Sequence, residues 1–150
     1  MLDLTKRSLD TFAASDWDGF KACFAPNAVY EEYATRRRVT GAEEIAALDM
    51  GWKAAFPDAV ATVKSSYTAD DAEIVEVEWE GTNKGALQTA VGTLPATNMR
   101  VKVGAVLINK ISNDKIVELH HYFDMLGLLQ QLGAPVTGAE KAKPEQPVFH

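Results

Sequence analysis

The chain has 150 residues, of which 47% are hydrophobic and 24% are charged, so it has enough apolar residues for one globular domain with a substantial core. A formal net charge of −6 disfavours a nucleic-acid partner, which would select a basic surface. The single cysteine, Cys23, excludes an intramolecular disulfide and a cysteine-rich zinc site. No signal-peptide pattern and no membrane-spanning apolar run is present, so we expect a cytoplasmic protein without a membrane partner.

The first third of the chain predicts short helices and one strand. Apolar residues at helical spacing indicate helices at 3–13 and 15–24, and alternation indicates a strand at 28–34. The capping-box pattern Thr40-x-x-Glu43 then predicts a third helix, which ends near Pro57.

The middle of the chain changes to alternating apolar and polar residues, which is typical of strands with one buried face. The strands are expected at 60–69, 72–83, 99–111 and 115–123. A helical turn follows at 125–133. Short helices followed by a run of antiparallel strands predict an α+β domain over residues 1–133, with helices gathered on one face of a curved sheet. The proline-rich segment 134–150 is expected to be a flexible tail.

Signatures of several enzyme classes are missing from the sequence. It contains no GxGxxG, Walker, HExxH or G-x-S-x-G motif. His120 and His121 are adjacent on a predicted strand, so they point to opposite faces and cannot chelate one metal together. We therefore expect neither a metal site nor a cofactor.

The last predicted strand has two faces of different character. Leu119 and His121 share one face, and Glu118, His120, Tyr122 and Asp124 share the other. The polar face either meets solvent, with Asp124 as a helix cap, or lines a pocket in which desolvation raises the pKa of Asp124. The same ambiguity, core or pocket wall, applies to the three tryptophans at 17, 52 and 79.

Three stretches of the chain resemble the SnoaL-like polyketide cyclase family of the nuclear-transport-factor-like superfamily. They are AAFPDA, WEGTNKGAL with GTLPATNMRVKV, and DKIVELHHYFDMLGLLQQLG. The resemblance covers about residues 1–133. It implies a cone-shaped fold, in which a strongly curved antiparallel sheet wraps around the N-terminal helices and encloses a pocket. It also implies a homodimer, to which the alternating apolar residues at 101–107 could contribute unless they are buried against the protein's own helices.

The resemblance implies a reaction as well as a fold. Cyclases of this family close a ring by intramolecular aldol condensation without metal or cofactor, and Asp124 holds the position of their acid/base. His120 replaces a tryptophan common in this motif, and Asn83 replaces a histidine common in the family. On this basis we expect Asp124 and His120 to be catalytic and a hydrophobic small molecule to be the ligand. The expected substrate-binding residues are Trp17, Tyr30, Trp52, Trp79, Asn83 and Tyr122.

Two other functions fit the same residues. The chain could be an isomerase or hydrolase of the superfamily. It could also be a non-catalytic, dimeric ligand-binding module, in which Asp124 is an exposed helix cap.

Overall fold

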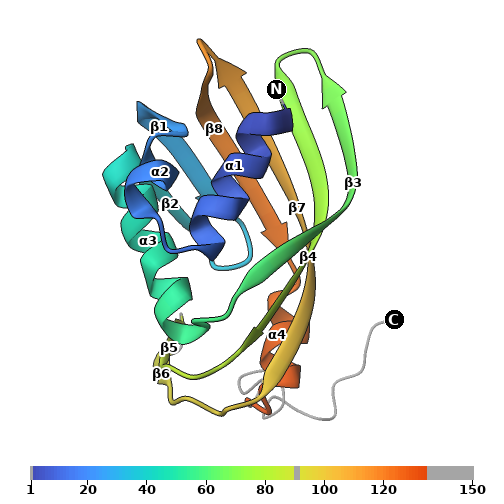
Figure 1. Cartoon of the computed structure of the whole chain (residues 1–150). Coiled ribbons are helices and arrows are strands. Elements are labelled where there is room, and N and C mark those ends of the chain that lie inside the picture. The colour runs from blue at the N-terminus through green and yellow to red at the C-terminus, as the bar shows by residue number, and fades with distance from the viewer. Residues whose placement is uncertain (1, 90–91, 135–150) are drawn as a thin grey trace.

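The computed structural model describes residues 2–89 and 92–134, which form helices and strands in the predicted order (Figure 1). The helices are α1 (Leu2–Ala13), α2 (Trp17–Lys21), α3 (Ala42–Ala55) and α4 (Met125–Gln131). The strands are β1 (Phe24–Glu32), β2 (Arg37–Thr40), β3 (Val60–Ala69), β4 (Ala72–Thr82), β5 (Leu87–Thr89), β6 (Gly92–Leu94), β7 (Arg100–Ser112) and β8 (Lys115–Phe123).

Six of these strands form one curved sheet in the order β2-β1-β8-β7-β4-β3, and the sheet does not close on itself. Helices α1, α2 and α3 lie on one face of the sheet (Figure 1), so the predicted α+β fold with a curved sheet around N-terminal helices is confirmed. One detail differs from the antiparallel sheet expected, because β1 pairs with β8 in parallel. This pairing places Tyr30 beside Leu119, although they are far apart in the sequence. The small β5–β6 hairpin was not predicted.

The core lies between the helices and the concave face of the sheet. Leu9 and Phe12 of α1 pack there with Val75 and Val77 of β4, as the helical and strand periodicities require. The alternating apolar residues of β7 join the same core, where each is at most 8% exposed: Val101, Val103, Ala105 and Leu107. The idea that they supply a dimer contact is therefore wrong, because they point to the face that the protein's own helices cover.

The start of α3 differs from the predicted capping box. The N-cap is Gly41, and no side chain caps the helix. Gly41 has a φ of 100°, a conformation that glycine adopts without the steric cost that other residues would incur. Its N–H donates to the Ala28 carbonyl at 2.7 Å, which ties the start of α3 to β1.

Two sequence predictions concern residues outside the described ranges. One is the flexible tail at 134–150, of which only residue 134 is described. The other is the boundary between the domain and this tail. Within the described residues, no helix is long and apolar enough to cross a membrane.

Candidate functional site

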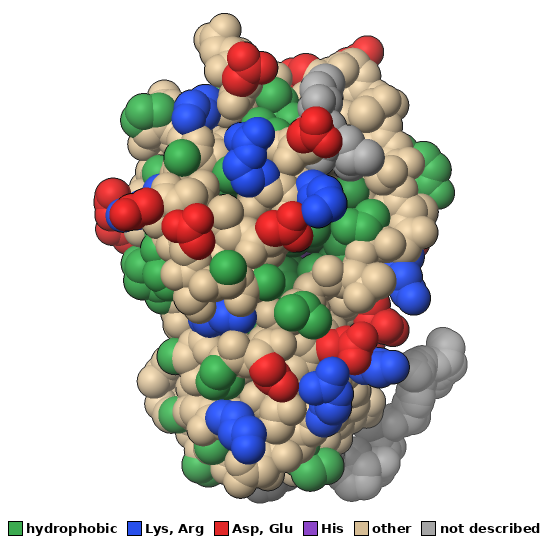
Figure 2. Space-filling model, in the orientation of Figure 1, with side chains coloured by type: hydrophobic (Ala, Val, Ile, Leu, Met, Phe, Trp, Pro, Cys, Tyr) green, Lys and Arg blue, Asp and Glu red, His purple; other side chains and the backbone are tan. Residues whose placement is uncertain are grey.

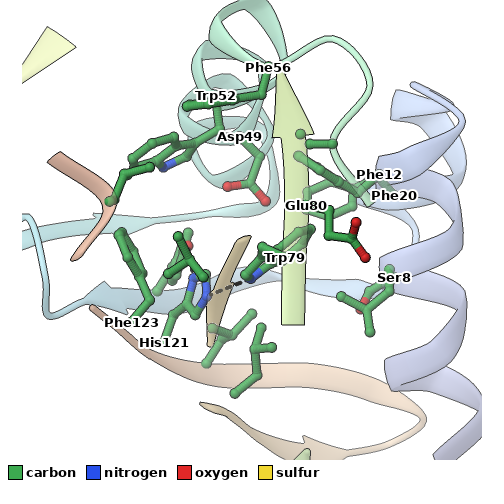
Figure 3. Close-up of a pocket in the computed structure, with 18 of the residues that line it drawn as sticks. Ser8, Phe12, Phe20, Asp49, Trp52, Phe56, Trp79, Glu80, His121 and Phe123 are labelled. Atoms are coloured by element: carbon green, nitrogen blue, oxygen red, sulfur yellow. Dashed lines mark hydrogen bonds between the residues drawn. The ribbon is translucent and has the colours of Figure 1, made fainter. Parts of the chain in front are cut away.

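A cavity of about 100 Å³ lies between helices α1–α3 and the sheet. This is room for several water molecules or for one small organic molecule. Its wall is mostly apolar and aromatic (Figure 3). The aromatic side chains that line it include Phe12, Phe20, Tyr30, Trp52, Trp79 and Phe123.

Asp49 is the acidic residue that α3 contributes to this wall. It lies four residues after Ile45 and three before Trp52, so the helical repeat places all three on one face. Figure 3 shows Asp49 and Trp52 projecting from α3 toward the side chains of Trp79 and His121. No hydrogen bond to the Asp49 side chain is found among the residues that the structure describes.

The surroundings of Asp49 favour its protonated form. Burial raises the pKa of this carboxyl well above its usual value, and the negative charge of Glu32 raises it further. Arg37 opposes both effects. A carboxyl with a raised pKa in an apolar cavity can accept and return a proton near neutral pH, which is what a general acid/base requires.

His121 faces the same cavity from β8 and is held on both ring nitrogens. Trp79 Nε1 donates to His121 Nε2 at 3.3 Å, and His121 Nδ1 lies 2.9 Å from the Tyr30 hydroxyl. Because an indole N–H can only donate, Nε2 is the acceptor and the proton of the neutral ring is on Nδ1. Burial lowers the pKa of His121 to about 4, despite the opposing charge of Glu32. The imidazole is therefore neutral at physiological pH.

The hydrogen-bonded chain continues from His121 through Tyr30 to Glu32, which is fully buried. The Tyr30 hydroxyl donates to Glu32 Oε2 at 3.1 Å, and Trp52 Nε1 donates to the same oxygen at 2.8 Å. Arg37 donates to the other oxygen, Oε1, from Nε at 3.0 Å and from Nη2 at 2.7 Å. Both carboxyl oxygens of Glu32 thus accept hydrogen bonds. After burial, the negative charge of Glu32 is the second effect that raises the pKa of Asp49.

Three of the predicted substrate-binding residues come together at the cavity: Tyr30, Trp52 and Trp79. Their partners explain their orientation, because each donates a hydrogen bond within the network of His121 and Glu32. Each ring also presents apolar surface to the cavity. These residues therefore combine a binding wall with a fixed polar framework.

The polar face of the last strand is not part of the cavity wall, which β8 lines with Leu119, His121 and Phe123 instead. Asp124 is exposed and caps α4 by accepting a hydrogen bond from the Gly127 N–H at 2.8 Å. Its catalytic role stays a prediction.

Two further residues of that face, His120 and Tyr122, form an outer cluster with Tyr33. The Tyr33 hydroxyl lies 2.7 Å from His120 Nδ1, and the rings of Tyr33 and Tyr122 stack with centroids 4.2 Å apart. His120 Nε2 also lies 2.6 Å from Glu118 Oε2. These contacts hold His120 and Tyr122 away from the cavity, since side chains on successive strand positions point to opposite faces.

Asn83 and Trp17 also lie outside the cavity wall. The Asn83 side chain donates to the carbonyls of Ala55 and Gly85 and accepts from the N–H and hydroxyl of Thr97. Its hydrogen bonds therefore join the end of α3 to the loops around β5 and β6. Trp17 packs edge-on against Phe12 with ring centroids 5.9 Å apart, as a supporting residue behind the aromatic wall.

On the face seen in Figure 2, positive and negative side chains are interspersed rather than gathered by sign. A second, shallower pocket lies at the start of α3, and its lining includes Lys21, Glu43 and Lys115. Within residues 2–89 and 92–134, no three His, Cys, Asp or Glu side chains are grouped as ligands of one metal ion would be. The cavity is therefore the part of the described structure to which a function can be attached.

Sequence reasoning missed Asp49, Glu32 and the role of His121. The signal for Asp49 was an acidic residue inside the apolar stripe of a predicted helix. Glu32 follows Tyr30 by two residues, so strand alternation placed it on the buried face. His121 was assigned to the apolar face of the last strand, but which face lines a pocket could not be decided from alternation.

The structure is thus a small α+β domain in which a curved sheet and the helices packed against it enclose an acid-bearing aromatic cavity, and cavities of this kind are typical sites for small molecules. The comparison with protein families is more specific. The sequence model of the SnoaL-like polyketide cyclase family matches residues 3–132, so the chain belongs to this family. A search of curated proteins returns no match.

Solved structures confirm the fold. A proposed SnoaL-like polyketide cyclase from Jannaschia sp. CCS1 has a TM-score of 0.80 and 18% identity, over 89% of this chain and 92% of that one. A protein from Catenulispora acidiphila DSM 44928 with a ketosteroid isomerase-like fold, in complex with trimethylamine, has a TM-score of 0.75 and 19% identity, over 88% and 93%. IdmH from Streptomyces antibioticus, a proposed polyketide cyclase, has a TM-score of 0.74 and 21% identity, over 88% and 97%. At these identities the likeness shows the fold alone.

Proposed function

We propose that the protein is a cofactor-independent enzyme that transfers a proton on a hydrophobic carbonyl compound bound in the cavity, with Asp49 as the general acid/base. The observation that carries the proposal is a carboxyl of raised pKa in an aromatic cavity, without a hydrogen-bond partner among the described residues. Membership of a family named for polyketide cyclases supports this reaction class. The Catenulispora protein of similar fold is in complex with trimethylamine, which supports the proposal that a cavity in this fold can hold a small organic molecule.

The proposed reaction needs one group that both removes and returns a proton. The Asp49 carboxylate takes a proton from the carbon next to the carbonyl, and the electron pair of that C–H bond forms the enolate. The enolate either attacks a second carbonyl of the same molecule, as in an aldol ring closure, or is reprotonated elsewhere, as in an isomerisation. The protonated Asp49 then gives its proton to the new alkoxide or carbon. No redox step is required.

Neighbouring groups support this role. The indole N–H of Trp79 lies at the cavity wall, and its contact to His121 is long at 3.3 Å, so it is the donor that we assign to the enolate oxygen. Burial, and after it the negative charge of Glu32, raise the pKa of Asp49. Asp124, which the family motif favours, is the alternative acid/base, and a non-catalytic ligand-binding module is the alternative function.

The test is deuterium wash-in from D₂O at the carbons next to the carbonyl of 2-tetralone, a hydrophobic ketone, followed by NMR. The wild type should accelerate the exchange, and Asp49→Asn should reduce the acceleration by at least ~10²-fold, as for loss of a general acid/base. Asp124→Asn should remain within about twofold, because it removes a capping carboxylate outside the cavity wall. The exposed carboxylate of Glu44, on the same helix as Asp49, gives the control Glu44→Gln.

Two outcomes would overturn the proposal. Loss of exchange in Asp124→Asn, with Asp49→Asn unaffected, would assign the acid/base role to Asp124. Binding of 2-tetralone by the wild type without accelerated exchange would favour the ligand-binding module.

A further inference from the structure

The wall of the cavity contains a continuous series of aromatic rings, all labelled in Figure 3. Successive ring centroids along the series lie 5.1–6.3 Å apart. The members in order are Phe12, Trp79, His121, Phe123, Trp52 and Phe56. Neighbouring rings meet edge to face or tilted in most of these contacts. Two of the rings already face a cation of the protein, since Lys53 Nζ lies 5.2 Å from the ring centroid of Phe12 and Arg37 Cζ lies 5.8 Å from that of Trp52. The faces of Trp and Phe rings carry negative potential, which attracts cations.

The charges of the cavity wall have one sign. The ionisable residues that line it, apart from Tyr30, are Asp49, Glu80 and His121, and no Lys or Arg is among the lining residues described. Since the pKa of His121 is lowered to about 4, the ring adds no positive charge at neutral pH. Glu80 is paired with Arg100 at 2.9 Å. Asp49 is thus the carboxyl that remains available to a ligand.

The cations nearest to this wall are already engaged. Arg37 pairs with Glu32 at 2.7 Å. Lys53 donates to the carbonyls of Ala13 and Ala59 at 2.9 and 3.2 Å. An anionic ligand would lose its hydration without finding a free positive partner, and it would lie near the charge of Glu32.

We propose that the cavity selects a hydrophobic ligand with a positively charged ammonium group and rejects carboxylates and other anions. The ammonium pairs with Asp49, and the aromatic series surrounds its methyl or methylene groups. This inference rests on the site proposed above but not on proton transfer there. Desolvated cation–π contacts contribute about 2 kcal/mol, which corresponds to roughly 30-fold in affinity, and exposed ones less.

The pairing has a consequence for pH. The groups that act on Asp49 are Glu32, which favours its protonated form, Arg37, which opposes it, and Tyr30, which stays neutral because burial, first, and the nearby carboxylates raise its pKa well above its usual value. Glu80 and His121 also line the cavity, the first paired with Arg100 and the second neutral. A permanent cation that pairs with Asp49 favours its ionised form, so binding releases a proton. Affinity for such a cation therefore rises with pH until Asp49 is ionised in the free protein.

The experiment compares three ligands with a phenyl ring, equal numbers of non-hydrogen atoms and different charge: phenyltrimethylammonium, tert-butylbenzene and benzenesulfonate. Binding is measured by quenching of tryptophan fluorescence, since Trp52 and Trp79 line the cavity. At neutral pH the cation should bind about tenfold tighter than the neutral isostere, and the sulfonate at least tenfold weaker than it. The affinity for the cation should rise with pH, whereas that for tert-butylbenzene should not.

The variant Asp49→Asn should remove the preference for the cation and its pH dependence while affinity for tert-butylbenzene is retained, and Glu44→Gln should behave as the wild type. Equal or tighter binding of benzenesulfonate, no binding of any of the three, or an unchanged cation preference in Asp49→Asn would overturn the inference. The two proposals fail separately. Cation selectivity without deuterium exchange in ketones contradicts only the proposed reaction, and exchange without cation selectivity contradicts only this inference.

Discussion

Asp49 and His121, which both line the cavity, should make the stability of the protein respond to pH in a way that two substitutions reveal. Between pH 4 and 6.5, His121 is neutral in the folded protein, where its pKa is about 4, but protonated in the unfolded chain, where it is about 6.5. The unfolded state then binds the extra proton, so this residue makes stability rise with pH. Asp49 has the opposite effect, because its raised pKa keeps a proton in the folded state that the unfolded carboxyl has lost.

While Asp49 remains protonated in the folded state, its effect on the pH dependence of stability cancels that of His121. A substitution of either residue therefore reveals the effect of the other. Each full proton of difference is worth about 1.4 kcal/mol per pH unit. Over the range in which Asp49 stays protonated in the folded state and ionised in the unfolded chain, Asp49→Asn should therefore gain up to about 1.4 kcal/mol of unfolding free energy per pH unit relative to the wild type. Over the same range His121→Gln should lose a similar amount. Glutamine can still accept from Trp79 and donate to Tyr30, so it retains the polar pattern.

The measurement is urea unfolding of the three proteins at several pH values, and the quantity compared is the slope of unfolding free energy against pH. The difference between two such slopes removes the contributions that all three proteins share. Examples are Asp58, whose pKa is lowered by a backbone N–H, and Glu118, whose pKa is lowered by His120. Parallel curves for the wild type and both variants would refute the argument, because the proton inventory of the cavity would then be the same in the folded and unfolded states.

Two further predictions concern stability. Tyr30→Phe removes the hydroxyl between His121 and Glu32, so a buried carboxylate and a buried ring N–H each lose a hydrogen-bond partner. The free energy of unfolding, measured with urea, should fall by about 2–4 kcal/mol. A change below ~0.5 kcal/mol would mean that the chain of hydrogen bonds is not formed. Gly127→Ala places a Cβ 2.3 Å from Asp124 Oδ2 and should cost about 1 kcal/mol by breaking the cap of α4. In an Asp124→Ala background the same change should instead stabilise by up to ~1 kcal/mol, from helix propensity; equal effects in both backgrounds would contradict the capping role.

The order and approximate position of most elements could be predicted because they depend on local patterns. The bounds were less accurate, since the second helix was expected at 15–24 but ends at Lys21, and the first strand was expected at 28–34 but begins at Phe24. The short strand β2 was not predicted. The alternation of Val75, Val77 and Trp79 identifies a buried strand face without reference to any other part of the chain. The β5–β6 hairpin was missed because its strands have three residues each, too few to show a period. The parallel pairing of β1 with β8 could not be predicted, because it joins segments about ninety residues apart and leaves no trace in the pattern of either strand.

The site depends on this non-local pairing, which explains why its residues were only half recognised. Tyr30 lies opposite Leu119 in the register, so its hydroxyl reaches the ring of His121, two positions further along β8. If β8 turned its other face inward, His120 and Tyr122 would replace His121 and Phe123 in the cavity, and the sequence would show the same alternation. What decides between the faces is the set of partners on other elements: Trp79 on β4, Tyr30 on β1 and the helix that carries Asp49. The local signals of this site are its two acidic residues at positions of apolar periodicity, Asp49 in the helical stripe and Glu32 in phase with Tyr30, because placing a carboxyl there has a cost that a functional role can explain.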